Sequence, residues 1–204
     1  MALSGQYTVY HLHSHLSNGV TNIDSVTKYM EYIDRAKELG MKAMAFSEHG
    51  SVFEWYHKKA AIEAAGMKYI HAVEAYLTTD LAEKVRDNFH CVLLARNYEG
   101  FLELNSLVSR SFDRSNNHFY YVPRISFEEL FSASRNLLIT TACIGGVFGK
   151  GDKETQDRFL DFMTQNRERC FFEIGHHSDE SQVTYNKHLW ELSRETGIPL
   201  IAGT

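Results

Sequence analysis

Histidine and acidic side chains lie where the predicted strands of this chain end. His11 and His13 are separated by one residue, and alternation along a strand points both imidazoles to the same side. His49 follows a short apolar run and precedes Gly50, which permits a tight turn. Glu74 lies in an otherwise apolar run, where an unpaired charge would be costly to bury. Imidazole and carboxylate groups in these positions indicate a metal site.

Two further residues extend this pattern. His90 opens the apolar run 91–95, and Cys143 ends a predicted strand just before two glycines. Imidazole, carboxylate and thiolate ligands together favour a transition ion over magnesium or calcium, which prefer oxygen ligands. We expect two to three divalent ions, with zinc as the first choice and manganese or iron as alternatives. Such ions can bridge a phosphate and generate a hydroxide near neutral pH, so the pattern predicts phosphoester hydrolysis.

Taken singly, each of these residues has a more ordinary explanation. A lone histidine is more often a hydrogen-bonded structural or surface residue, and Cys143 alone would be a small buried hydrophobe. The metal site therefore rests on their joint placement. The other residues of these types are assigned as follows: His71, Cys91 and Cys170 to packing, His57 and His188 to helix surface or packing, and His118 to a polar loop, while His15 and His176-His177 stay open between the site and solvent.

The elements that must position these residues alternate between strands and helices. Strands are predicted at 7–12, 42–47, 69–77, 90–95, 137–141, 171–175 and 200–202. Helices are predicted from an Asp24 cap to Gly40, and at 53–65, 99–112, 126–134, 153–166 and 180–196. Seven strands in this order imply a mainly parallel sheet closed into a barrel, with an open doubly wound sheet as the rival. In a parallel barrel, functional groups collect where the strands end.

Composition restricts the class of protein. The chain has 204 residues, of which 44% are hydrophobic, and we expect one domain over 1–204. A net charge of -5 disfavours a broad basic surface for nucleic acid, so any DNA contact must be local or supplied by a partner. Three scattered cysteines predict reduced thiols. Without an apolar span or a secretory signal, we expect a cytoplasmic protein with no membrane partner.

Several segments together resemble the PHP (polymerase and histidinol phosphatase) domain, in the version at the amino terminus of bacterial-type DNA polymerase III alpha subunits. They are HLHS at 11–14, AFSEHG at 45–50, VEAY at 73–76, HCVLLARN at 90–97, FYYVPRI at 119–125, LLI at 137–139 and ACIGG at 142–146. The stretch from 119 to 146 is the most specific, because it is typical of the polymerase subunit and not of stand-alone phosphatases. The resemblance covers essentially the whole chain.

The resemblance implies an α/β fold of a distorted, TIM-like (β/α)7 barrel. It implies a metal-dependent phosphoesterase or 3′ to 5′ exonuclease site within a DNA-directed DNA polymerase. The partners would be the remaining polymerase domains of the same subunit and a DNA 3′ end. His49 and Glu74 would be catalytic, and Cys143 would replace the histidine usual in small PHP phosphatases. The implied metal ligands are His11, His13, His49, Glu74, His90 and Cys143.

Two departures from the family pattern are visible. The ligand expected a few residues after His13 is missing from Ser17-Asn18-Gly19, and Asn18 and Asp24 are the alternatives. The family's final Asp-x-His motif would begin where the chain ends at Thr204, so we expect a domain truncated before that motif and a barrel that lacks its last elements. Two other functions stay open: a stand-alone histidinol-phosphatase-like enzyme and a non-catalytic, structural metal-binding module of the polymerase.

Overall fold

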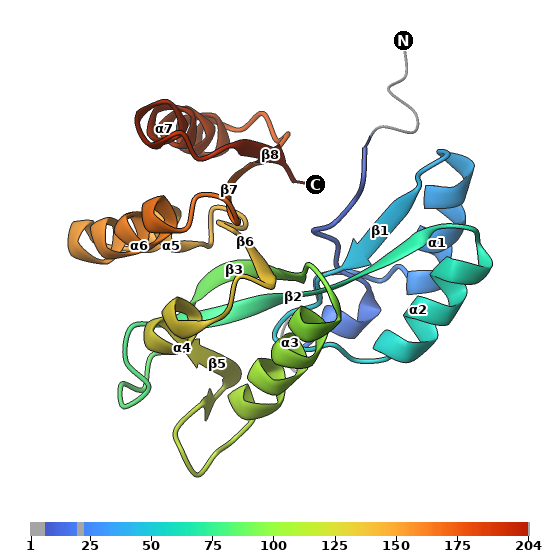
Figure 1. Cartoon of the computed structure of the whole chain (residues 1–204), viewed down its shortest axis with the longest axis horizontal. Helices are drawn as coiled ribbons and strands as arrows, with labels where there is room; N and C mark the ends of the chain where they lie inside the picture. The colour runs from blue at the N-terminus through green and yellow to red at the C-terminus, as the bar shows by residue number, and fades with distance from the viewer. Residues whose placement is uncertain (1–6, 20–22, 204) are drawn as a thin grey trace.

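The computed structural model of the chain describes residues 7–19 and 23–203 and shows an α/β fold. Its single curled sheet forms a half barrel with helices packed along the outer side (Figure 1). The expected distorted, TIM-like barrel with missing elements is therefore confirmed. Residues 1–6 and Thr204, on which the expectations about a signal segment and the final motif depend, lie outside the described residues.

Helices and strands alternate through most of the chain. The helices are η1 (His15–Ser17), α1 (Tyr29–Glu38), α2 (Trp55–Ala64), α3 (Tyr98–Ser111), α4 (Phe127–Ser132), α5 (Val147–Lys150), α6 (Lys153–Gln165) and α7 (Glu180–Thr196). The strands are β1 (Ala43–Phe46), β2 (Lys68–Thr78), β3 (Phe89–Ala95), β4 (Phe119–Tyr120), β5 (Val122–Ser126), β6 (Leu137–Thr140), β7 (Cys170–Ile174) and β8 (Leu200–Ala202). None of the described helices is both long enough and apolar enough to cross a membrane.

Strand β2 organises the sheet. Its first half pairs with β1 and its second half with β5, both parallel, while β3 runs antiparallel along its other edge. β3 is also antiparallel to β6, whereas β6, β7 and β8 are mutually parallel neighbours. The expected mainly parallel order is therefore wrong at β3. In the described connection 79–88 no helix intervenes, and a parallel partner would require a longer crossover.

Two of the elements predicted near the amino terminus differ from the structure. Residues 7–12 form no strand of their own, and a single bridge joins Val9 to Met44 of the short strand β1. Helix α1 begins at Tyr29 and not after an Asp24 cap. The backbone N–H of Asp24 donates instead to Oδ1 of Asn18, which holds Asp24 in the loop before the helix.

The hairpin of β4 and β5 was not predicted, because Pro123 made this stretch resemble a loop. Tyr121 occupies the turn with a φ of 62°, and Phe119 pairs with Pro123 across it. Arg124 is fully buried, and its guanidinium donates to the carbonyls of Glu83 and Leu81 in the 79–88 connection. This side chain therefore ties the hairpin to that connection.

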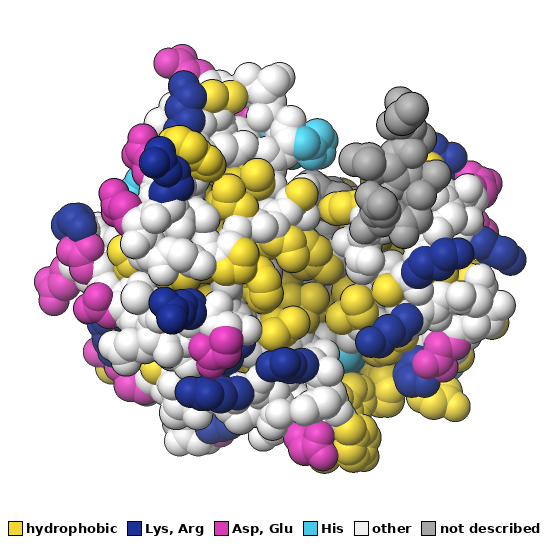
Figure 2. Space-filling view, turned by 45° about the horizontal axis from the view of Figure 1, so that its top comes forward, with side chains coloured by type: hydrophobic (Ala, Val, Ile, Leu, Met, Phe, Trp, Pro, Cys, Tyr) yellow, Lys and Arg dark blue, Asp and Glu magenta, His cyan; other side chains and the backbone are white. Residues whose placement is uncertain are grey.

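The main apolar core lies between the sheet and the helices that cover its outer side. A smaller cluster, formed by Tyr10, Ala45, Ala72, Val92, Leu94 and Ala142, lies on the inner side of the curled sheet. Figure 2 shows hydrophobic side chains gathered in a hollow at the middle of one face of the molecule.

His71 is a packing residue of β2, as expected, and it predicts a pH effect. Burial lowers its pKa to about 4, so the folded state keeps the ring neutral while the unfolded chain takes up a proton below about pH 6.5. The contribution of the neutral His71 ring to the unfolding free energy is therefore complete above that pH and is lost on acidification. We expect His71→Gln to reduce the loss of unfolding free energy between pH 6.5 and 4 by about 3 kcal/mol. Urea titrations in chelator measure this difference, and identical pH slopes would contradict it.

Candidate metal centre

Glu74 is the hub of a cluster of four imidazoles. The carboxylate lies on β2 and is only 1% exposed. Its oxygens lie 2.7 Å from His49 Nδ1, 3.1 Å from His90 Nδ1, and 3.2 Å from the Nε2 atoms of His11 and His13. A single buried anion is thus shared by four rings that come from three other parts of the chain.

The loop after β1 is fastened beside β2 by backbone hydrogen bonds. Glu74 N donates to the Glu48 carbonyl at 3.1 Å, and Gly50 N donates to the Glu74 carbonyl at 2.7 Å. Gly50 has a φ of 60°, and a Cβ atom there would lie 2.5 Å from Pro123, so only glycine fits this turn. The turn places His49 directly next to Glu74.

The other ligand candidates arrive on neighbouring strands. His90 is on β3, two residues from the position opposite Glu74. A bridge between His90 and Gly146 brings the loop after β6 alongside, and Cys143 Sγ lies 3.6 Å from His90 Nδ1 and 4.0 Å from Glu74 Oε1. The structure therefore brings together all six residues for which a ligand role was predicted.

Two groups of three ligand atoms can be distinguished in the cluster. His11, His13 and Glu74 form one group, and His49, Glu74 and His90 form the other; within each, all atoms lie within 4.8 Å of one another. Because Glu74 belongs to both groups, it is placed to bridge two cations. This donor set of imidazole, carboxylate and thiolate indicates divalent metals.

The electrostatics of the cluster depend on Glu74. Burial would raise its pKa, but the four surrounding imidazoles hold it well below the usual range. Burial would lower the pKa of His90, yet Cys143 and Glu74 raise it to about 9. The pKa of His11 is likewise raised despite burial, by Glu173 and Glu74. Metal uptake must therefore displace protons from these rings.

The outer nitrogens of two rings are held by carboxylates. His11 Nδ1 lies 2.5 Å from Glu173 Oε1, and His49 Nε2 lies 3.0 Å from Asp24 Oδ2. When the ring is neutral, an outer N–H that donates to a carboxylate places the lone pair on the inner nitrogen, which faces Glu74. Metal-binding histidines are commonly oriented in this way.

The outer nitrogen of His13 is held by a buried polar network. Glu48 accepts hydrogen bonds from Lys58 Nζ at 2.6 Å and from Ser14 Oγ and Ser17 Oγ at 2.5 Å each. The proton of Ser17 is thereby used, so Ser17 Oγ accepts from His13 Nδ1 at 2.8 Å. Burial would raise the pKa of Glu48, but Lys58 and the two hydroxyls lower it. Glu48 is therefore an ionised support of the site.

We expect Ser17→Ala to weaken divalent-metal binding by about 10- to 100-fold, the range found for partners that orient metal-binding histidines. The substitution removes the acceptor of His13 Nδ1, so His13 can adopt the tautomer with its proton on Nε2. Competition with a chromophoric chelator measures the affinity. Ser132→Ala, at an exposed hydroxyl that bonds only a backbone carbonyl, is the control. Equal affinities for Ser17→Ala and the unmodified chain would contradict the proposed orientation.

Two buried atoms in the cluster are arranged as if to share a cation. His49 Nδ1 and Glu74 Oε2 lie 2.7 Å apart, but neither makes a hydrogen bond with correct geometry to any described residue. Lone pairs that point at a common position between side chains account for this arrangement. A cleft of about 600 Å³ opens over the cluster and is lined also by Asp24 and His177.

The structure places four residues whose positions the sequence left open. Asp24 reaches the cleft, whereas Asn18 bonds the backbone of the loop that holds Asp24. His177 lines the cleft, whereas the His15 ring lies 6.1 Å from the Tyr29 ring, nearly parallel to it.

Glu173 was missed by the sequence analysis. The residue is 4% exposed on the apolar strand β7 and lies next to His11. The feature that identified Glu74 could also have identified Glu173, because both are acidic residues inside an otherwise apolar strand.

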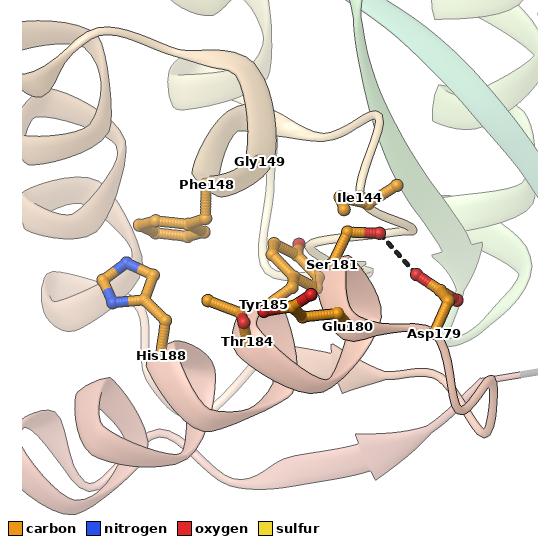
Figure 3. Close-up of a pocket in the computed structure, with 9 residues that line it drawn as sticks. All are labelled: Ile144, Phe148, Gly149, Asp179, Glu180, Ser181, Thr184, Tyr185 and His188. Atoms are coloured by element: carbon orange, nitrogen blue, oxygen red, sulfur yellow. Dashed lines mark hydrogen bonds between the residues drawn. The ribbon is translucent and has the colours of Figure 1, made fainter.

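A larger cavity, of about 750 Å³, lies between α5 and the start of α7 (Figure 3). It is next to the cleft over the cluster. Phe148 and His188 lie next to each other at one side of the cavity, and Asp179 bonds Ser181 and caps α7. Tyr185 connects the two regions, because its hydroxyl donates to the Cys143 carbonyl at 3.3 Å. The candidate metal ligands lie in the smaller cleft, so we assign the site there.

Comparison with known proteins agrees with this geometry. A family model described as PHP domain matches residues 10–176. The DNA polymerase III subunit alpha of Borreliella burgdorferi and that of Aquifex aeolicus are each 30% identical over 94% of this chain. The chain spans only 17% and 18% of the lengths of those two relatives.

Two solved structures share the fold. A protein from Bifidobacterium adolescentis assigned as a metal-dependent phosphoesterase superposes with a TM-score of 0.61 at 12% identity, covering 96% of this chain and 86% of the other. An amidohydrolase from Chromobacterium violaceum gives 0.59 at 17% identity, covering 97% and 86%. At these identities the likeness establishes the fold alone.

Proposed function

Because this chain belongs to the PHP domain family, we propose that it is the amino-terminal phosphoesterase module of a replicative DNA polymerase III alpha subunit. The observation that carries the catalytic part is the sharing of Glu74 by two groups of three ligand atoms. The polymerase part is supported by the relatives, which match along 94% of the chain. The proposed partners are the other domains of that subunit and a DNA 3′ end, and the proposed compartment is the cytoplasm.

The proposed ligand set combines borderline imidazoles, a soft thiolate and a hard carboxylate. Imidazole and thiolate favour zinc first, with manganese or iron as alternatives, and two to three ions fit the number of donors. When bound, such ions polarise a phosphate and lower the pKa of a coordinated water. The proposed ligands are His11, His13, His49, Glu74, His90 and Cys143.

The residues of the chain supply the positions and charges for this chemistry. Glu74 balances the positive charge of the cluster from a buried position, and His49 lies beside it at the base of the open cleft. We therefore propose both as catalytic. Asp24 orients His49 from the rim, and His177 reaches the cleft from the loop before α7, where its ring can donate to a phosphate oxygen.

The test uses the chain loaded with zinc, manganese or iron and a single-stranded DNA labelled at its 5′ end. Stepwise shortening from the 3′ end that stops in chelator and in His49→Ala would support the proposal. Hydrolysis of p-nitrophenyl phosphate without shortening of DNA would favour a stand-alone phosphatase instead. Bound metal with neither activity would favour a structural metal-binding module, and either of these outcomes would overturn the exonuclease assignment.

A further inference from the structure

A second groove lies at the opposite end of β2 from the metal centre. It has a volume of about 670 Å³, and the described residues that line it include several aromatic rings and three cations but no acidic side chain. The chain as a whole has 26 acidic and 21 basic residues, so a lining without acid is a local departure. Its charge is complementary to an anionic ligand.

One wall of the groove is aromatic. The Phe101 ring packs edge-on against Trp55 at 4.9 Å between centroids and lies nearly parallel to Tyr98, at 11° and 6.0 Å. Tyr98 is 68% exposed, so its ring face is available to a ligand. His71 lies at the base of the groove, where it is 4% exposed and bonds Tyr69 and Asn105 through its two nitrogens.

Two cations of the groove, Lys68 and Arg96, have no acidic side chain within ion-pair distance among the described residues. The third, Lys59, is paired with Glu63. Both unpaired cations line the groove together with the apolar side chains of Ile70 and Leu94. Apolar surface thus lies directly beside unpaired positive charge.

The groove is separate from the metal centre. Lys68 precedes Glu74 by six residues on the same strand, which corresponds to about 20 Å. A ligand of the groove would therefore not contact the metal-binding side chains.

We propose that this groove binds a nucleotide, with the base against Tyr98 and Trp55 and the phosphate on Lys68 and Arg96. Every base presents a flat face that stacks on aromatic side chains, and arginine holds phosphate oxygens through paired N–H groups. The volume lies in the range of small-molecule sites. A free nucleotide and a nucleotide within a single strand share this chemistry.

Trp55 is a natural reporter, because the chain has only one other tryptophan, Trp190. In a Trp190→Phe background and in chelator, which removes metal-dependent phosphate binding at the metal centre, dAMP should quench Trp55 saturably. Lys68→Ala with Arg96→Ala should raise the Kd at least about tenfold, as expected for loss of charged hydrogen bonds. Lys37→Ala with Arg167→Ala, at two exposed positions elsewhere, removes the same charge and should leave the Kd unchanged.

A short oligodeoxynucleotide with Kd at least about tenfold below that of dAMP would identify a strand as the source, and equal affinities would identify the free nucleotide. Deoxyadenosine that binds as tightly as dAMP would overturn the phosphate contact. An acidic peptide with one aromatic residue that binds more tightly than either nucleotide probe would replace the proposal with a protein partner. Failure to saturate up to about 10 mM dAMP would overturn it altogether.

Discussion

Replacing Glu74 by glutamine is expected to weaken binding of divalent metal by more than about 100-fold, beyond the loss seen for partners that only orient a ligand. The carboxylate is the group shared by both sets of ligand atoms, so the change affects both cations together. It also removes the anion that helps to raise the pKa of His11 and His90. Titration calorimetry and metal analysis of the purified protein measure the effect.

Glu99→Gln is the matched control for this prediction, because Glu99 is exposed at the start of α3. Far-ultraviolet circular dichroism of both variants in chelator tests whether the fold is retained. Metal content and affinity that are equal in Glu74→Gln and Glu99→Gln would show that Glu74 is no ligand.

Replacing Lys58 by methionine is expected to lower the free energy of unfolding by about 3–5 kcal/mol, as for other buried ion pairs that lose one partner. Lys58 is 2% and Glu48 1% exposed, and their charged atoms lie 2.6 Å apart. Methionine has a similar shape, so the main effect is an uncompensated carboxylate in the interior. Urea unfolding in chelator at neutral pH measures the change without a contribution from metal.

Two further variants test the assignment of this loss to Glu48. Lys59→Met removes an exposed pair with Glu63 on the same helix and should change the unfolding free energy by only about 0.5 kcal/mol. Adding Glu48→Gln to Lys58→Met should recover about 1–3 kcal/mol, because no buried charge is then left unpaired. Equal losses in Lys58→Met and Lys59→Met would show that the buried pair is unimportant for stability.

The network around Glu48 links stability to the metal centre. Ser17 joins Glu48 to the His13 ring and also accepts a hydrogen bond from the backbone N–H of His49 at 3.1 Å. Loss of Lys58 should therefore disturb two ligand candidates as well as the fold. Glu48, which precedes the ligand candidate His49, thus has a structural role of its own.

Local patterns in the sequence predicted much of the fold. Helices α2, α3, α6 and α7 and strands β2, β3 and β6 lie within two residues of the predicted ranges, because apolar periodicity and caps are local properties. The pairing of the strands is not local. The direction of β3 and the parallel pairing of β5 with β2 depend on how the connections fold. Strand β5 was not predicted, because Pro123 made its sequence resemble a loop.

The sequence by itself determined the six side chains of the cluster, because histidine, acidic and cysteine residues at strand ends are visible without coordinates. Only the tertiary structure decided how each ring is turned. Glu173 lies 162 residues from His11 and still selects the nitrogen of His11 that faces Glu74. The outer hydrogen bonds of His11 and His49 join segments that are distant in the sequence, so strand pairing and loop packing create them and no pattern along the chain reveals them.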